Sequence, residues 1–192
     1  MAATSTMLAL GTEAPGFTLP DVVTGDTVAL EDFADADALL VMFICNHCPY
    51  VKHIRSGLVA LGVDYLDSPL GIVAISSNDT DVSPGDTPEE MAREARDYGY
   101  AFPYLFDESQ QVARAYTAIC TPDFFLFDGD RRLVYRGRFD EARPNTETPI
   151  TGADLRSAID ATLNGAPVSG EQFPSMGCSI KWTPGNTPAY AG

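Results

Sequence analysis

The chain has 192 residues, 45% of them hydrophobic, and carries 27 acidic against 12 basic residues for a net charge of −15. This length and apolar content suit one well-buried domain rather than two. The acidity argues against binding to nucleic acids and to anionic membrane surfaces, because no basic patch is available to neutralise phosphates.

The N-terminal part of the chain predicts only short elements. Its first ten residues lack a positively charged segment and a long apolar core, and no stretch reaches the roughly 18 apolar residues of a membrane span. We therefore expect neither a secretory signal nor a membrane span. A cytoplasmic location is the resulting expectation. Apolar stretches around Thr24-Gly-Asp-Thr27 predict a hairpin over residues 17–30, and Glu31-Asp-Phe33 predicts a short turn.

A buried strand and a long helix flank the first two cysteines. The six apolar residues from Leu39 to Ile44 predict a strand buried on both faces, as in the centre of a parallel sheet. After Pro49, apolar residues at spacings of three and four predict an amphipathic helix: Val51, Ile54, Leu58, Leu61 and Tyr65. Since proline favours the first helical position, Cys48 falls at or next to the N-cap.

This position predicts that Cys48 is reactive. Its thiol would meet unpaired backbone N–H groups and the positive end of the helix dipole, and both favour the thiolate. A neighbouring imidazolium at His47 would lower the pKa of Cys48 further. An intracellular Cys-x-x-Cys pair is more often redox-active or metal-binding than structural. Within that pair, Cys45 suits a resolving thiol and a packed strand-end residue about equally.

The rest of the chain alternates predicted strands and helices. They are a buried strand at 72–75, a helix from 88 to 98, a strand at 104–106, a helix at 109–117, a hairpin of 123–127 with 133–136, and a helix ending near 164. A right-handed βαβ crossover should join the first two buried strands. We expect residues 1–165 to form the domain. Residues 166–192, rich in Pro, Gly and Ser but holding Cys178, should form a tail packed on or near it.

This order of elements, with Cys-x-x-Cys ending the first buried strand, resembles the thioredoxin arrangement. The segment Ala118-Ile-Cys120-Thr-Pro122 resembles the cis-proline loop of that superfamily, and the opening Leu10-Gly-Thr-Glu-Ala-Pro-Gly-Phe-Thr-Leu-Pro20 resembles that of AhpC/TSA and redoxin proteins. Over about residues 10–165 the chain is thus similar to peroxiredoxin-like members carrying Cys-Asn-His-Cys-Pro-Tyr-Val. The resemblance implies an α/β thioredoxin-like fold with an N-terminal extension and a central mixed sheet flanked by helices.

The cysteine motif departs from both parent patterns. Thioredoxin-like reductases carry a buried resolving cysteine three residues after the exposed one, where this chain has Val51. Peroxiredoxins carry Thr or Ser three residues before the peroxidatic cysteine and Pro seven before it, where this chain has Cys45 and Val41. The motif therefore predicts Cys48 as the nucleophile and leaves peroxide reduction and disulfide reduction open.

The resemblance also implies roles for residues outside the motif. Thr121 and Pro122 would form the loop that faces the catalytic thiol, with Cys120 either near that thiol or serving only in packing. Peroxiredoxins hold the peroxide with an arginine that follows the hairpin strand. Strand alternation would place Arg136 and Arg138 on one face of the sheet. Either arginine would then hold the peroxide, or both would form surface ion pairs with the neighbouring carboxylates, Asp140 or Glu141.

The disulfide partner of Cys48 is ranked by the distance that a disulfide can span. Cys45 comes first because only a strand-to-helix turn separates it from Cys48. Cys120 comes second, because it reaches Cys48 only through the cis-proline loop. Cys178 comes last, because the whole tail would have to fold back over the site.

We therefore expect a cytosolic thiol-dependent antioxidant oxidoreductase that needs no cofactor. The Cys48 thiolate would attack a hydroperoxide, form a sulfenic acid, and then a disulfide that a thioredoxin-type or small thiol reduces. The alternative is a disulfide reductase or isomerase that forms a mixed disulfide with an exposed protein disulfide. A lesser alternative is a zinc- or copper-binding protein with four candidate ligands: Cys45, His47, Cys48 and His53.

Overall fold

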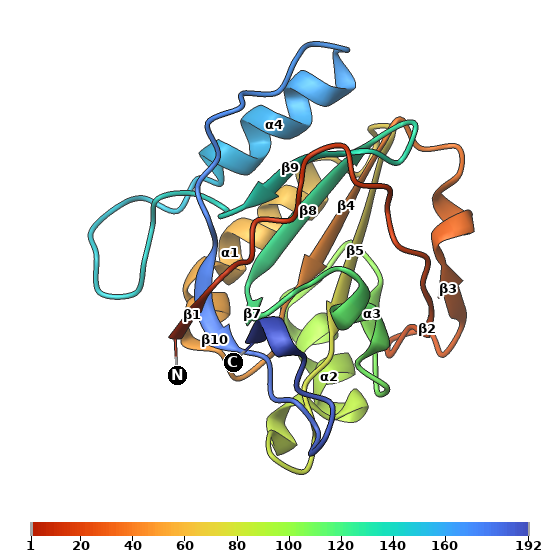
Figure 1. The fold of residues 1–192 in the computed structure, drawn as a ribbon, viewed down its shortest axis with the longest axis vertical. Coiled ribbons are helices and arrows are strands. Elements are labelled where there is room, and N and C mark those ends of the chain that lie inside the picture. Colours follow the sequence, from red (N-terminus) through yellow and green to blue (C-terminus); the bar gives the residue numbers. More distant parts are fainter. Residues whose placement is uncertain (1, 192) are drawn as a thin grey trace.

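The computed structural model describes residues 2–191. Its centre is a five-stranded sheet in the order β6-β5-β4-β8-β9 (Figure 1). The strands are β4 (Ala38–Phe43), β5 (Leu70–Ser76), β6 (Tyr104–Phe106), β8 (Asp123–Asp128) and β9 (Leu133–Gly137). β4 runs parallel to β5 and antiparallel to β8, so the sheet is mixed, as predicted.

The central strand β4 is buried on both faces because every residue in it is apolar. Its side chains alternate between two core clusters, with Leu40 and Met42 in one and Val41 and Phe43 in the other. Full burial of each such side chain stabilises the fold by about 1.5–3 kcal/mol. The sheet is thus held between two apolar layers, with β4 in its middle.

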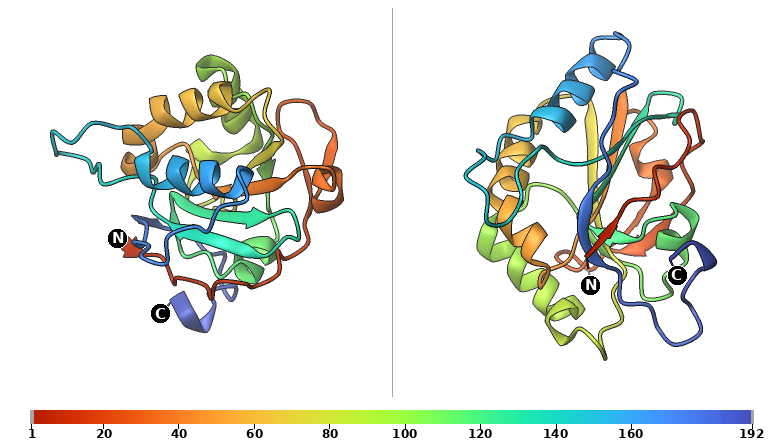
Figure 2. Two further views of the ribbon diagram at one scale, coloured as in Figure 1. Left: turned by 90° about the horizontal axis from the view of Figure 1, so that it is seen from above. Right: turned by 60° about the vertical axis from the view of Figure 1, so that its left-hand side comes forward.

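Helices cover both faces of this sheet (Figure 2). Helices α1 (Pro49–Asp64), α2 (Pro88–Tyr98) and α4 (Ala153–Leu163) pack on one face, and α3 (Gln111–Ala115) packs on the other with the N-terminal segment. The 3₁₀ helices are Leu30–Phe33, Pro84–Asp86 and Ala189–Ala191. No helix among residues 2–191 is long and apolar enough to cross a membrane.

Two smaller sheets complete the fold. The predicted N-terminal hairpin is present as β2 (Thr18–Pro20) and β3 (Thr27–Ala29). The other sheet is unexpected, because it joins the two ends of the chain to the cis-proline loop: β1 (Ala2–Thr4), β10 (Met176–Ser179) and β7 (Cys120–Thr121) pair in the order β1-β10-β7. The C-terminal tail therefore runs back along the domain and lies beside the N-terminus (Figures 1 and 2).

Candidate active site

The cysteine motif occupies the turn between β4 and α1. β4 ends at Phe43, α1 begins at Pro49, and Cys48 is the N-cap residue, as predicted. Proline fits at the start because the first N–H groups of a helix have no partner within it. Cys48 is 0% exposed and Cys45 is 1% exposed, so both sulfurs lie inside the protein.

The cis-proline loop lies against these two cysteines. The peptide bond between Thr121 and Pro122 is cis, as the resemblance implies. The Cys48 thiol donates to the Thr121 carbonyl oxygen at 3.1 Å, and Cys45 Sγ lies 3.2 Å from Thr121 Oγ1. The loop and the motif, more than 70 residues apart in sequence, therefore form one site.

Hydrogen-bond donors around Cys48 favour its thiolate. The Cys45 thiol lowers the pKa of Cys48 most, the backbone N–H groups of Val51 and Cys178 and the Cys178 thiol act in the same direction, and burial opposes them. The Thr121 carbonyl oxygen accepts from the Cys48 thiol and so stabilises its protonated form, but it is one acceptor against several donors. Cys48 is therefore the group that ionises.

Cys45 keeps its proton while Cys48 gives its proton up. The pKa of Cys45 is raised, first by its hydrogen bond with Cys48, then by burial and by the negative charge of Asp86. A protonated thiol donates a hydrogen bond, so Cys45 stabilises the Cys48 thiolate in the reduced protein. The adjacent cysteines thus have different roles.

Cys45→Ala should raise the pKa of Cys48, because alanine cannot donate a hydrogen bond. The rate at which iodoacetamide alkylates wild-type Cys48 should hold as the pH falls below 9.0, the ordinary pKa of a thiol, since the thiolate persists there. In Cys45→Ala the midpoint should rise by about one unit or more. Cys45→Ser keeps a donor and is the matched control. Equal midpoints in all three proteins would contradict the assignment.

Asp86 holds the motif in place, and no sequence pattern pointed to this role. This carboxylate is fully buried, and its Oδ1 accepts hydrogen bonds from the N–H groups of Asn46 at 2.8 Å and His47 at 3.2 Å. Its Oδ2 bonds to His47 Nδ1 and accepts from the Asn78 amide at 2.9 Å. Burial alone would raise the pKa of Asp86, but these bonds outweigh it and lower the pKa.

The same cluster is the best candidate for a metal site in the described residues, and it differs from the predicted one. Cys45, His47 and Asp86 each offer a ligand atom, and these atoms lie within 4.8 Å of one another. His53, predicted as a ligand, lies outside this group, with a buried Nε2 that has no partner in the structure. Because His47 Nδ1 and Asp86 already bond each other, a metal would have to replace that bond.

Both predicted arginines bond to groups outside the cysteine motif, and Arg138 lines a small hollow together with Tyr50 and Pro122. The Arg136 guanidinium donates to the carbonyl of Leu8 at 2.8 Å and to Gln172 Oε1 at 2.6 Å. The Arg138 guanidinium pairs with Asp154, rather than with the neighbouring carboxylates expected as its alternative partners, and lies 4.4 Å from the Phe173 ring centroid. β9 ends at Gly137, so the strand alternation behind the prediction does not extend to Arg138.

The remaining two cysteines, Cys120 and Cys178, both lie close to the motif. Cys120 is buried, its sulfur lies 3.7 Å from the Pro122 carbonyl oxygen, and burial raises its pKa strongly. Cys178 lies in β10 directly opposite Thr121, and it packs on the core cluster that contains Cys48. The tail therefore does fold back over the site, which was the objection to Cys178 as a partner of Cys48.

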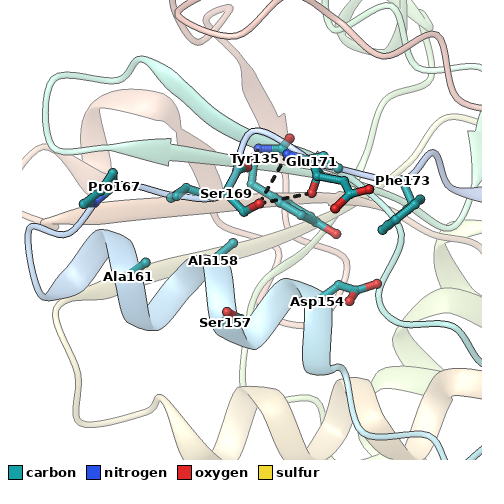
Figure 3. A pocket seen from close by; sticks show the side chains of 11 residues that line it. Tyr135, Asp154, Ser157, Ala158, Ala161, Pro167, Ser169, Glu171 and Phe173 are labelled. Carbon is teal, nitrogen blue, oxygen red and sulfur yellow. Dashed lines mark hydrogen bonds between the residues drawn. The ribbon is translucent and has the colours of Figure 1, made fainter.

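One surface hollow reaches the cysteine motif, and a second lies apart from it. A groove of about 550 Å³ between α1 and α2 reaches Asn46 and His47, and both acidic and basic side chains line it. A pocket of about 410 Å³ lies between α4 and the tail, where Asp154, Tyr135 and Phe173 line it (Figure 3). None of the lining residues of that second pocket belongs to the cysteine motif.

Comparisons with known proteins place the chain among redox proteins of this fold. The family model described as AhpC/TSA matches residues 10–136. A solved structure from Geobacillus kaustophilus, titled an uncharacterized conserved protein, is 52% identical with a TM-score of 0.94, over 96% of this chain and 97% of that chain. No curated protein matches.

Two more distant structures share the fold. A putative thiol:disulfide interchange protein DsbE from Chlorobium tepidum is 20% identical, with a TM-score of 0.63 over 81% of this chain and 99% of that chain. Peroxidoxin BcpB from Mycobacterium tuberculosis is 20% identical, with a TM-score of 0.60 over 81% of this chain and 96% of that chain. The predicted thioredoxin-like fold is confirmed.

Proposed function

Because the chain belongs to the AhpC/TSA family, we propose that it is a thiol peroxidase that reduces small hydroperoxides with the Cys48 thiolate. The observation that carries the proposal is the set of hydrogen-bond donors that faces this sulfur at the start of α1. They keep the nucleophile ionised at neutral pH without a separate base. A thiolate, rather than a thiol, attacks a peroxide.

The proposed step is a two-electron transfer. The Cys48 thiolate attacks the terminal oxygen of the hydroperoxide, so that a sulfur–oxygen bond forms as the oxygen–oxygen bond breaks. The leaving alkoxide or hydroxide takes a proton from water. Cys48 is oxidised to a sulfenic acid, and the peroxide is reduced to an alcohol or water. Cys45 stands where peroxiredoxins carry Thr or Ser, and its thiol supplies a hydrogen-bond donor from that position.

The burial of Cys48 favours a small substrate. Its side chain is 0% exposed, and the cis-proline loop and β10 lie beside it. A hydroperoxide needs only a small opening between side chains to reach such a sulfur, whereas a protein disulfide requires that the sulfur meet a surface. The burial therefore argues for peroxide over protein disulfide.

Disulfide reduction or isomerisation is the second candidate. It is supported by the loss of the peroxiredoxin signature at Val41 and Cys45. In that reaction the Cys48 thiolate would attack a substrate disulfide and form a mixed disulfide. Peroxide reduction and disulfide reduction both consume reducing equivalents, for which a thioredoxin-type protein or a small thiol of the cytoplasm is the proposed source; isomerisation consumes none.

One preparation assayed in two ways separates the candidates. We expect consumption of hydrogen peroxide, followed directly with dithiothreitol as reductant, to exceed the spontaneous rate by about two orders of magnitude or more. Reduction of insulin disulfides should stay near the dithiothreitol background. The reverse pattern would reject the peroxidase and support the reductase. Chelated and unchelated preparations should behave alike; activity that depends on added zinc or copper would favour the metal alternative.

A further inference from the structure

The tail strand β10 brings Cys178 to the reactive cysteine. β10 pairs antiparallel with β7, and Cys178 stands directly opposite Thr121. Residues paired in this way have Cα atoms about 4.5–5.5 Å apart. Thr121 is also the residue whose carbonyl oxygen accepts the Cys48 thiol at 3.1 Å. Cys48 and Cys178 therefore both lie next to Thr121, and β10 contacts α1.

The exposure of the residue distinguishes Cys178 from the other cysteines. Cys45, Cys48 and Cys120 are buried, whereas Cys178 is partly exposed, and all four are free. A disulfide is reduced by attack of an external thiolate on one of its two sulfurs. A bond between Cys45 and Cys48 would offer no accessible sulfur. A bond between Cys48 and Cys178 would include one cysteine that is partly exposed.

We propose that Cys178 is the resolving cysteine, and that the oxidised protein contains a Cys48–Cys178 disulfide. This inference rests on the proposed function. The Cys178 sulfur attacks the sulfur of the Cys48 sulfenic acid, a sulfur–sulfur bond forms, and the hydroxyl leaves as water with the Cys178 proton. In a thiol–disulfide reaction the same attack would displace the substrate thiol from a mixed disulfide.

The charge on Cys48 couples the two steps. The pKa of Cys178 is raised by burial first, and also by its hydrogen bond and charge interaction with Cys48, while Lys181 lowers it. When Cys48 becomes a sulfenic acid its negative charge disappears, and so does that contribution to the pKa of Cys178. The resolving thiol thus ionises more readily once there is an oxidised sulfur to attack.

Reduction of the bond then proceeds from the outside. An external thiolate attacks the sulfur of the partly exposed Cys178, the sulfur–sulfur bond breaks, and Cys48 leaves as a thiolate. A thiol of low pKa is the better leaving group, and the donors around Cys48 lower its pKa. A second reductant thiol releases Cys178 and carries away the oxidised reductant, so both cysteines return to their starting state.

The test maps the disulfide in the full-length protein. Reduced wild-type protein receives one equivalent of hydrogen peroxide, or separately glutathione disulfide, is blocked with N-ethylmaleimide, and is digested for mass spectrometry. We expect a Cys48–Cys178 peptide in both arms. In Cys178→Ser, Cys48 should remain as a sulfenic acid that dimedone traps. Steady-state turnover should fall about tenfold or more, while the first turnover stays within about twofold of wild type.

Ser179→Ala is the matched control, because this residue neighbours Cys178 in β10 and should leave mapping and turnover unchanged. A Cys45–Cys48 or Cys48–Cys120 link in wild type would overturn the inference, as would unimpaired cycling of Cys178→Ser. Peroxide that leaves Cys48 unmodified would instead reject the proposed peroxidase. In that case the glutathione arm still decides: a Cys48–Cys178 link supports the inference, and a persistent glutathione adduct on Cys48 overturns it.

Discussion

Cys48→Ser should abolish peroxide reduction, with a loss on the order of 10³-fold or more in the rate of peroxide consumption. A serine hydroxyl stays protonated at neutral pH in this position, and its oxygen cannot accept an oxygen atom from a peroxide as sulfur does. None of the remaining cysteines can replace Cys48, because the pKa of each is raised rather than lowered. Initial rates of peroxide loss, with and without reductant, measure the effect.

The variant should stay folded, because a serine hydroxyl can still donate to the Thr121 carbonyl as the thiol does. Circular dichroism and thermal unfolding check this. Ser56→Ala, on the exposed part of the same helix, is the matched control and should keep wild-type rates. If Cys48→Ser retained half of the activity, another thiol would have to be the nucleophile, and the argument from the helix start would be wrong.

Local patterns predicted the fold and the centre of the site well. The apolar run of β4, the spacing of apolar residues in α1 and the proline at its start depend only on neighbours in sequence. Together they place Cys48 at the N-cap with no knowledge of tertiary contacts. The position of the cis-proline loop, by contrast, came from a resemblance rather than from periodicity.

The features that the sequence patterns did not predict depend on contacts between segments that are distant in sequence. Asp86 lies in a polar loop that holds several acidic residues, and only the fold brings this one to the N–H groups of Asn46 and His47. Strands β1, β7 and β10 have two to four residues, too few for an alternating pattern to stand out. Without β10, nothing in the sequence places Cys178 near Cys48. The sequence therefore ranks Cys178 last among the candidate disulfide partners of Cys48.

Glycine at two positions lets the tail lie so close to the site. A Cβ atom at Gly177 would stand 1.9 Å from the Thr121 carbonyl oxygen, and one at Gly137 would stand 2.1 Å from the Phe173 carbonyl oxygen. Gly137 also has a φ of +134°, which other residues rarely adopt. Both contacts involve backbone atoms, which cannot move aside as the end of a long side chain can. The approach of the tail to β7 and β9 therefore requires glycine.

Gly177→Ala should separate β10 from β7, because a 1.9 Å contact with a backbone oxygen cannot form. We expect a loss of about 1–3 kcal/mol or more in the free energy of unfolding, as for other overpacked sites, from urea titration. Cys48 and Cys178 should react several-fold faster with N-ethylmaleimide, because the packing of β10 on β7 no longer shields them from solvent. Cleavage by a protease within residues 166–180 should be faster for the same reason.

Gly170→Ala provides the matched control, because it lies in the same tail and a Cβ there meets nothing within 4 Å. It should match wild type in urea titration, alkylation and proteolysis. The comparison isolates the docking of β10 from the general effect of replacing a tail glycine. Peroxide-treated Gly177→Ala should also form less of the Cys48–Cys178 disulfide, since the disulfide needs the two Cα atoms within about 7 Å. Wild-type alkylation rates in Gly177→Ala would mean that β10 does not cover Cys48 in solution.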